Sequence, residues 1–167
     1  MEIFDAERIP SHGGSIRVYA ARKGERVISN AVADLIKDEE KSGLYQKETF
    51  EDFAEKVRQN QLAMLRIVSG IKSGGGRIVG IGAPAKGNTL LNYYDMNPTI
   101  VDYLVEKSAL KIGMFAPGSR IPVVEEERLF KDQPEYALLL SWNLADELIP
   151  KIKGKGYKGK FIIPLPK

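Results

Sequence analysis

The sequence predicts an α/β protein with a Rossmann-like, doubly wound and mostly parallel sheet, preceded by a β-hairpin and a long helix. Three observations lead to this prediction. The apolar runs Ile78–Ile81 and Tyr136–Leu140 have the length and composition of buried parallel strands. Strand-like and helix-like segments alternate along the second half of the chain. A G-x-G motif, Gly80–Gly82, overlaps the end of the first run and precedes a helical segment, as in dinucleotide-binding folds.

The chain is expected to divide into a hairpin with a helical extension, residues 1–73, and a Rossmann-like core, residues 74–167. The extension is expected to pack on the core, so that the whole chain forms one compact domain. Alternating residues over Glu2–Arg8 and Ser15–Arg22 predict the two strands of the hairpin, joined by the turn at Pro10–Gly14.

Two helices are expected between the hairpin and the glycine turn. The first covers Val27–Lys41, with Val27 and Ile28 on its inward face. Residues 49–52 resemble a capping box, so a second, amphipathic helix is expected to begin there and to run for about 24 residues, or about 36 Å. Asn60 interrupts its apolar seam. A helix of this length could join two domains or hold a partner helix, but packing on the sheet is the interpretation that we favour.

The core is expected to alternate between strands and helices after the glycine turn, with right-handed crossovers. Asn143 is expected to cap the last helix, which Pro150 shortens or kinks. The expected elements, in chain order, are a helix over Lys86–Met96, strands over Thr99–Val105 and Ile121–Val124, a helix over Glu125–Lys131, a strand over Tyr136–Leu140, a helix from Asn143 to Lys153 and a strand over Phe161–Ile163.

Composition limits the classes of site and partner. The 167 residues carry a net charge of +3, no cysteine and a single histidine, so we expect no metal site. The lysines of residues 151–160 alternate with glycines and have few aromatic neighbours, so we expect no nucleic-acid partner. No run approaches the ~18 apolar residues of a membrane helix, and the first residues lack the features of a signal peptide. We therefore expect a cytoplasmic protein with no membrane partner.

The candidate binding site lies at the glycine turn. In doubly wound sheets, ligands bind at the carboxyl ends of the strands, near the point where the strand order reverses. Backbone N–H groups at a helix start attract anions, and Lys86 adds a positive charge there. With Ala85 as its third small residue the motif is weak, and a glycine turn without a ligand is the alternative. The candidate residues of this turn are Gly82, Ala83, Lys86, Gly87 and Asn88.

Two further strand ends carry candidate residues. Trp142, followed by Asn143, could stack a base or a sugar, or it could cap the core. Glu106 stands 24 residues beyond Gly82, near the position of a carboxylate that binds ribose in dinucleotide sites. A surface ion pair with Lys107 is the alternative for Glu106.

The hairpin supplies the last candidates. His12 follows Ser11 on a glycine-flanked turn, where it could bind a polar ligand or cap the turn. Ser15 and Arg17 alternate onto one strand face, and Arg17 could hold a phosphate or a carboxylate with two hydrogen bonds. One histidine does not allow a Ser/His/Asp triad to be assembled, so we assign no catalytic residue.

With these motifs identified, the sequence resembles the C-terminal domain of the S-adenosylmethionine-dependent C-methyltransferases, a family that includes enzymes acting on nucleotide-linked deoxysugars. The block Gly-Ala-Pro-Ala-Lys-Gly-Asn-Thr is far more specific than a G-x-G pair. Five blocks in the family's order span most of the chain, namely residues 11–17, 80–92, 111–123, 141–144 and 161–166.

The resemblance implies a second Rossmann-like domain that closes over a methyl-donor domain, in cis or in trans, and helps to bind the substrate. It implies a nucleotide-linked sugar or a similar phosphorylated compound at the glycine turn, with His12, Ser15 and Arg17 approaching the reacting substrate. S-adenosylmethionine would be the cofactor of the full-length parent. The family's zinc module, donor domain and catalytic segment are absent from this sequence. We therefore expect the isolated chain to fold, but neither to bind S-adenosylmethionine nor to catalyse methyl transfer.

Two other classes of function stay open. The chain could be a stand-alone Rossmann module that binds NAD or coenzyme A as a sensor or scaffold, in which case Glu106 would bind the ribose. Alternatively, the glycine turn binds nothing and the domain only supports its neighbour, because a fold does not imply a function.

Overall fold

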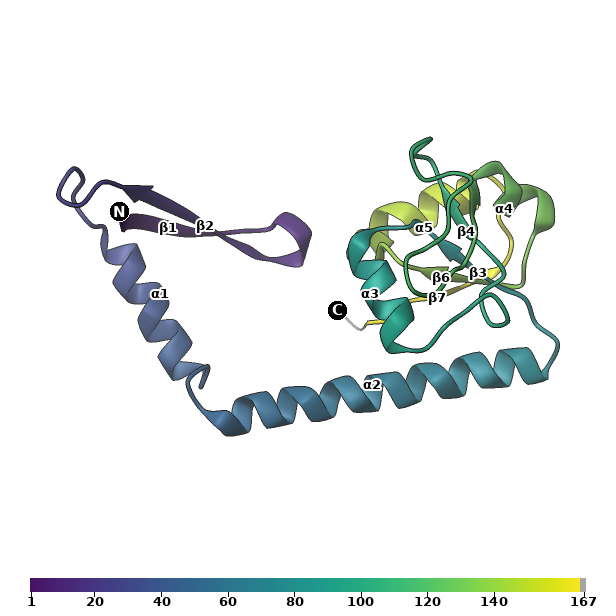
Figure 1. Ribbon diagram of the computed structural model, residues 1–167, viewed down its shortest axis with the longest axis horizontal. Coiled ribbons are helices and arrows are strands. Elements are labelled where there is room, and N and C mark those ends of the chain that lie inside the picture. The colour runs from purple at the N-terminus through teal and green to yellow at the C-terminus, as the bar shows by residue number, and fades with distance from the viewer. Residues whose placement is uncertain (166–167) are drawn as a thin grey trace. The chain divides into compact units, whose positions relative to one another are not determined.

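The computed structural model describes residues 1–165 and contains two compact units, Met1–Val57 and the part of the chain from Arg58 onward. The boundary between the units lies inside a long helix, α2 (Lys47–Ser73) (Figure 1). The sequence-based division after residue 73 stays a prediction.

The first unit begins with the predicted hairpin, which is confirmed. Strands β1 (Glu2–Ile9) and β2 (Ser15–Ala21) pair in antiparallel register, from Glu2 opposite Ala21 to Ile9 opposite Ser15. A short 3-10 turn, η1 (Ser11–Gly13), joins them, and His12 at its centre has a left-handed φ of 56°. The candidate histidine therefore lies at the tip of the hairpin.

Helix α1 (Asn30–Lys41) begins three residues later than expected. Its start is displaced because Ser29 is tied to β1. The Ser29 N–H donates to the Phe4 carbonyl at 2.8 Å, and the Ser29 hydroxyl donates to Asp5 Oδ1 at 2.5 Å. Val27 and Ile28 are consequently outside the helix and are 92% and 54% exposed, so the expectation that they face inward was wrong.

Helix α2 has 27 residues and begins at Lys47, so Thr49 lies in its first turn and is not the expected N-terminal cap. Only Met64 and Val68 are buried, four residues apart on one face, and they belong to the hydrophobic core of the sheet. Asn60, which interrupts the apolar seam, accepts a hydrogen bond from the Tyr94 hydroxyl. Its amide also donates to the Pro164 carbonyl at 3.0 Å. The polar residue thus links α2 to two other segments of the second unit.

The second unit is built on five parallel strands in the order β5-β4-β3-β6-β7. The order reverses between the adjacent strands β3 and β6, which confirms the predicted doubly wound sheet. The strands are β3 (Ile78–Ile81), β4 (Leu104–Glu106), β5 (Val123–Glu125), β6 (Tyr136–Leu139) and β7 (Lys160–Ile162).

Strand β4 starts five residues later than the Thr99–Val105 run predicted. Asn97 is the reason, because its side-chain oxygen accepts hydrogen bonds from the Thr99 N–H at 2.9 Å and the Thr99 hydroxyl at 2.7 Å. Asparagine that bonds the backbone two residues ahead makes a turn. Three of the four β-branched residues of this run, Thr99, Ile100 and Val101, therefore lie in a turn and a bend before the strand begins.

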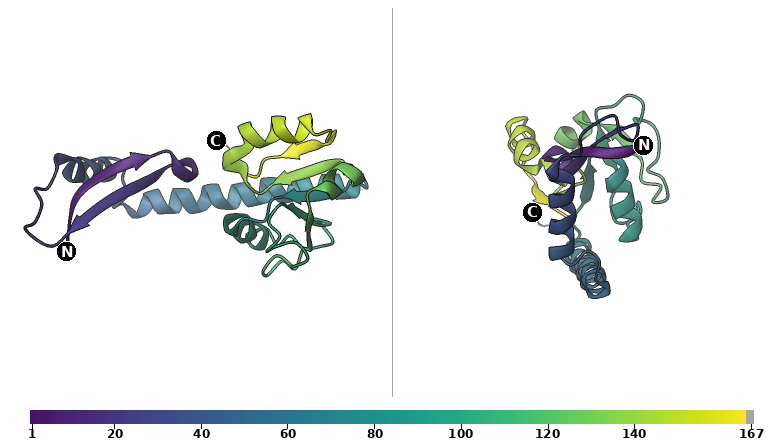
Figure 2. Two further views of the ribbon diagram at one scale, coloured as in Figure 1. Left: turned by 90° about the horizontal axis from the view of Figure 1, so that it is seen from above. Right: turned by 90° about the vertical axis from the view of Figure 1, so that its left-hand side faces the viewer.

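Helices cover both faces of the sheet (Figure 2, left). On one face, Ile78 and Leu138 pack with residues of α2 and of α3 (Ala85–Tyr93). On the other face, Val79 and Leu139 pack with residues of α4 (Glu127–Asp132) and α5 (Ala145–Gly154). This burial on both faces accounts for the continuous apolar runs in the sequence.

Helix α5 follows a 3-10 turn, η2 (Trp142–Leu144). Asn143 lies inside this turn, and the α5 cap position, Leu144, makes no side-chain cap hydrogen bond. The expectation that Asn143 caps the helix was therefore wrong. Pro150 stands inside α5.

Candidate functional site

The glycine turn lies at the carboxyl edge of the sheet, where the strand order reverses. The Gly82 N–H donates to the Val105 carbonyl at 2.8 Å, so the ladder between β3 and β4 continues one residue beyond β3. Gly82 then adopts a φ of +81°, which glycine tolerates far better than other residues. A Cβ atom at Gly82 would lie 3.0 Å from Ser141 Oγ at the end of β6. The turn is therefore between the ends of β4 and β6.

Helix α3 begins directly after this turn and has no side-chain cap. Pro84 occupies the cap position in an extended conformation, and a proline side chain has no hydrogen-bonding group. The Asn88 N–H donates to the Pro84 carbonyl at 3.1 Å and closes the first helical turn. The N–H groups before Asn88 have no intrahelical acceptor, and they give this end of the helix a positive partial charge. An anion at this edge of the sheet would meet those donors.

Lys86 connects the turn to the segment after β6. Its ammonium donates to Asn143 Oδ1 and lies 4.6 Å from the centre of the Trp142 ring. The first contact is a hydrogen bond, and the second is a cation–π interaction. Three candidates from opposite sides of the reversal point are thus in direct contact, which no local sequence pattern predicts.

The residue that packs closely on the sheet is not at the third position of the fingerprint. Gly80 lies within β3, where a Cβ atom would approach Leu104 Cδ2 to 2.4 Å. Ala85, expected as the third small residue, is exposed. Gly87 is buried instead, and a Cβ atom there would lie 2.9 Å from the Cβ of Leu140. Gly87, not Ala85, is therefore the residue that permits close packing of the helix on the sheet.

The side chain of Asn88 contains a hydrogen-bond acceptor without a partner in the part of the chain that the structure describes. Its side-chain oxygen is buried and has no hydrogen-bond partner among residues 1–165. One helical turn later, the Asn92 amide donates to the Asn88 carbonyl at 2.7 Å and to the Pro117 carbonyl at 2.9 Å. These bonds attach the loop before β5 to α3.

Glu106, at the end of β4, lies against the glycine turn. Its carboxylate accepts the N–H of Ala83 at 3.1 Å, and the N–H groups of Lys107 and Ser108 at 2.8 and 3.3 Å. Burial alone would raise the pKa of Glu106. The three N–H donors and the Lys111 ammonium at 3.4 Å outweigh burial and hold that pKa below its ordinary value.

The alternative ion pair between Glu106 and Lys107 is not formed. Lys107 pairs instead with Glu126, at 3.3 Å. The N–H of Ala83, one of the predicted anion donors, is already bonded to Glu106.

The hairpin candidates lie in the first unit. Arg17 pairs with Glu7 at 3.0 Å, and the Tyr19 hydroxyl donates to the same carboxylate oxygen at 2.6 Å. The Ser15 hydroxyl donates to the Ser11 carbonyl at 2.9 Å, and His12 is exposed. The proposed roles of these three candidates on a substrate stay predictions.

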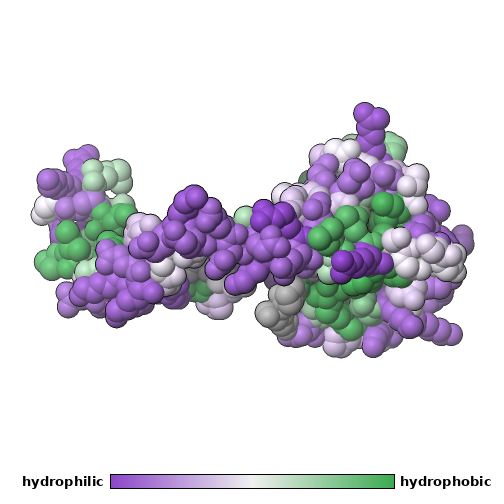
Figure 3. Space-filling model, turned by 90° about the horizontal axis from the view of Figure 1, so that it is seen from below, coloured by the Kyte–Doolittle hydropathy of each residue, from purple (hydrophilic) through white to green (hydrophobic). Residues whose placement is uncertain are grey.

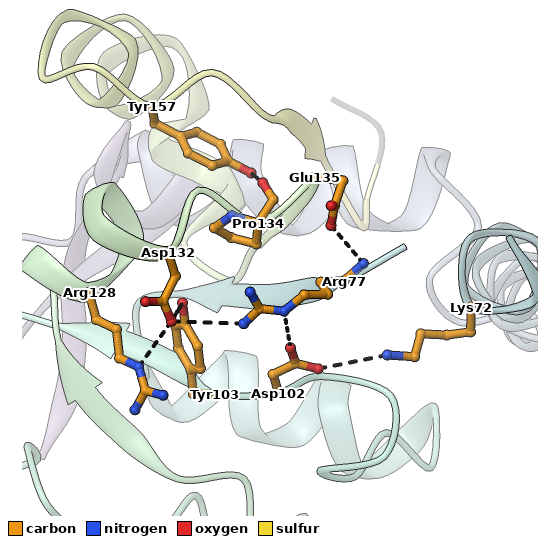
Figure 4. A network of polar contacts seen from close by, with 9 residues as sticks. All are labelled: Lys72, Arg77, Asp102, Tyr103, Arg128, Asp132, Pro134, Glu135 and Tyr157. Atoms are coloured by element: carbon orange, nitrogen blue, oxygen red, sulfur yellow. Dashed lines mark hydrogen bonds and ion pairs between the residues drawn. The ribbon is translucent and has the colours of Figure 1, made fainter. Parts of the chain in front are cut away.

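A polar network, which sequence reasoning missed, lies at the opposite edge of the sheet (Figure 4). Asp102 accepts one hydrogen bond from Arg77 at 3.0 Å and pairs with Lys72 at 3.7 Å, which joins the end of α2 to the segments before β3 and β4. Asp132 accepts from Arg128 at 3.1 Å and from the Tyr103 hydroxyl at 3.0 Å. These charges are satisfied by one another, so we interpret the network as structural.

Asp132 and Tyr103 titrate abnormally in this network. The hydrogen bond from Arg128 is the largest cause that lowers the pKa of Asp132. Burial, followed by the bond to Asp132, raises the pKa of Tyr103 to about 12.

A hydrophobic groove of about 450 Å³ lies between α2, α5 and the segment after β7. Figure 3 shows hydrophobic residues gathered beside α2 on this side of the second unit, where Ile67 and Ile163 are exposed. The groove is lined by Asn60, Ala63, Met64, Ile67, Ala145, Asp146, Ile149, Ile163, Pro164 and Leu165.

Residues 1–165 contain neither a candidate metal site nor a membrane-spanning helix. In that part of the chain, no three His, Cys, Asp or Glu side chains cluster as metal ligands would. None of the described helices is long and apolar enough to cross a bilayer.

The sequence is similar to known C-methyltransferases. The family described as C-methyltransferase C-terminal domain matches residues 10–166. C-methyltransferase NovU from Streptomyces niveus is 32% identical over 168 aligned residues, which cover 99% of this chain and 40% of that protein. The chain thus spans about two fifths of the length of this curated relative.

Proposed function

This chain belongs to the family of C-methyltransferase C-terminal domains, and from that membership we propose that it is the substrate-binding domain of an S-adenosylmethionine-dependent C-methyltransferase. The substrate in this proposal is a nucleotide-linked sugar or a similar phosphorylated polar compound. As part of the same proposal, the protein acts in the cytoplasm.

One observation supports a phosphorylated substrate most directly, namely Lys86 at the uncapped start of α3. The ammonium and the free N–H groups of the helix both favour an anion at this edge of the sheet. The Trp142 ring beside Lys86 offers a surface for a base or a sugar. The side-chain amides of Asn88 and Asn143 supply donors and acceptors for hydroxyl groups.

We propose that the methyl donor binds in another domain, in cis or in trans. A sulfonium cation would be repelled by Lys86, so the glycine turn does not suit S-adenosylmethionine. Methyl transfer requires the donor and the acceptor to be held in contact, and the donor domain must therefore close over this one. In that closed state, His12, Ser15 and Arg17 would approach the substrate.

The exposed hydrophobic residues of the first unit support such a partner domain. Residues 1–57 are all described, and Ala6 is their only buried hydrophobic residue. Large exposed apolar areas mark interaction surfaces. The exposed large hydrophobic residues of this unit are Met1, Ile3, Ile16, Val18, Tyr19, Val27, Ile28, Ile36, Leu44, Tyr45, Phe50 and Phe53.

The geometry of Glu106 weighs against the NAD-binding alternative. In dinucleotide sites, the carboxylate at this position accepts hydrogen bonds from ribose hydroxyls. A carboxylate has about four acceptor positions, and Glu106 already receives three N–H groups and the Lys111 ammonium. A ribose would have to displace at least one of these four donors.

Titration of the 167-residue chain with UDP-glucose, dTDP-glucose and GDP-mannose tests the proposal. Trp142 is the only tryptophan, so a ligand that draws Lys86 from its ring should change the fluorescence. We expect Lys86→Ala to weaken binding about 10- to 100-fold, since hydrogen bonds to charged groups contribute about 1.5–3 kcal/mol. Lys153→Ala, which removes an exposed lysine of α5, is the control. Equal binding by Lys86→Ala, or no binding of any of these nucleotide sugars to the wild type, would contradict the proposal.

A further inference from the structure

The contact between Glu106 and the glycine turn begins where the backbone ladder ends. The last ladder bond runs from the Gly82 N–H to the Val105 carbonyl at 2.8 Å. The next N–H along the chain, that of Ala83, donates to a side chain instead, Glu106 Oε2, at 3.1 Å. Glu106 thus extends the attachment of the turn to β4 by one residue.

Lys111 completes this contact from the other side of the same peptide segment. Its ammonium donates to the Ala83 carbonyl at 3.0 Å and lies 3.4 Å from Glu106 Oε2. The N–H and the carbonyl of Ala83 are therefore each held by a charged side chain of opposite sign. We call Glu106 and Lys111 together the Ala83 clamp.

The clamp acts on the residues that begin α3. Ala83 stands between Gly82, whose φ of +81° gives the turn its direction, and Pro84, which occupies the helix cap position. Charge-assisted hydrogen bonds are stronger than neutral ones, and a carboxylate that accepts several N–H groups is held in one orientation. Without the hydrogen bonds to the N–H and the carbonyl of Ala83, the turn between β3 and α3 would be free to adopt other conformations.

We propose that Glu106 is a positioning residue, which together with Lys111 holds the glycine turn in the conformation that presents Lys86 and the start of α3 to an anionic ligand. This inference rests on the proposed function, because it assumes that the turn binds an anion. Glu106 itself contacts no ligand in this arrangement. Its carboxylate accepts hydrogen bonds from backbone N–H groups of the protein. The corresponding carboxylate of a dinucleotide site accepts hydrogen bonds from the ribose.

Glu106→Gln tests the proposal because it keeps the size of the side chain but removes its charge. It also replaces one acceptor by an NH₂ group, which cannot accept a backbone N–H. We expect about tenfold weaker binding of inorganic pyrophosphate and of the nucleotide sugar that the wild type binds best. A turn that spends one tenth of its time in the competent conformation raises the apparent Kd tenfold. The control is Glu125→Gln, an exposed glutamate paired in register with Glu106, which should bind like the wild type.

Nuclear magnetic resonance supplies a readout that general destabilisation would not change. The amide resonance of Ala83 should titrate with Glu106 in the wild type, with a midpoint below the ordinary glutamate pKa of 4.5, because the N–H bonds and Lys111 favour the charged form. The same titration should be absent in Glu106→Gln and present in Glu125→Gln. An Ala83 resonance that does not titrate in the wild type would overturn the clamp.

The outcomes separate the two proposals. If the wild type binds none of the nucleotide sugars, the proposed function fails, whether or not it binds pyrophosphate. If the wild type binds and Glu106→Gln binds equally well, the positioning role fails and the proposed function stands. If Glu106→Gln does not fold, Lys111→Met decides, because it removes only the bond to the Ala83 carbonyl and one contact of the carboxylate. Wild-type affinity in Lys111→Met would then overturn the positioning role.

Discussion

Replacing Gly87 by alanine would add a methyl group where α3 packs directly on β6. The new carbon would lie 2.9 Å from the Cβ of Leu140 and 3.2 Å from Cγ and Cδ of Pro84. A Cβ atom moves only with its backbone, so Leu140 cannot rotate away from the added group. The helix and the sheet must therefore separate.

Two opposing effects determine the change in stability. Overpacking a core costs about 1–3 kcal/mol, whereas alanine in place of glycine within a helix contributes about 1 kcal/mol of stability. Because the closest contact is to a backbone-bound carbon that cannot rotate away, the overpacking cost should lie in the upper half of this range, at about 2–3 kcal/mol. We expect a net loss of about 1–2 kcal/mol, which corresponds to a thermal midpoint about 2–8 °C lower.

Gly70→Ala is the matched control for Gly87→Ala. Gly70 also lies inside a helix of the second unit, but a Cβ atom there would meet nothing within 4 Å. We therefore expect Gly70→Ala to raise the free energy of unfolding by about 1 kcal/mol. Circular dichroism during thermal unfolding measures both variants. A Gly87→Ala protein as stable as the wild type would refute the assignment of Gly87 as the close-packing residue.

Three more predictions follow from other contacts. Tyr157→Phe should lower the free energy of unfolding by about 1 kcal/mol, measured in urea, because the Pro134 carbonyl loses the buried hydroxyl that donates to it at 2.9 Å; an unchanged midpoint would count against it. The pKa of Asp132 in the folded protein lies below the ordinary value of 3.8. The stability that the charged Asp132 contributes is therefore complete above about pH 3.8 and is lost as the pH falls through the folded pKa. Asp132→Asn should therefore lose less stability than the wild type on acidification from neutral pH to about 3, and equal losses would argue against the network. The isolated chain should show no binding of S-adenosylmethionine by calorimetry, and micromolar affinity would contradict that expectation.

Short-range patterns predicted the sheet well. Ile78–Ile81 and Tyr136–Leu139 are recognisable because burial on both faces leaves no polar positions in a strand. Helix starts were less predictable, because distant residues determine them. The start of α1 depends on Ser29 and on Asp5, which is 24 positions earlier in the sequence. No local pattern around Ser29 contains that information.

In the candidate site, too, local sequence patterns identified individual residues but not the contacts between residues that are distant in the sequence. Lys86 was identifiable from the turn and the helix start around it. Its contact with Asn143 is not, because the two residues are 57 positions apart and meet only when β3 pairs with β6. The spacing from Gly82 selected Glu106 correctly as a residue beside the turn. Spacing did not reveal that Ala83 would be its partner.

The bond between Asn60 and Pro164 has a consequence for protein synthesis. The two residues are 104 positions apart, so the helix that carries Asn60 leaves the ribosome long before its partner is made. At roughly 5–20 residues per second, the interval is about 5–20 s. During that time the nascent chain exposes Met64 and Val68 without most of their final neighbours. A chain truncated before residue 164 would lack the bond that anchors α2 to the end of the sheet unit. Such a chain would be a substrate for chaperones and proteases.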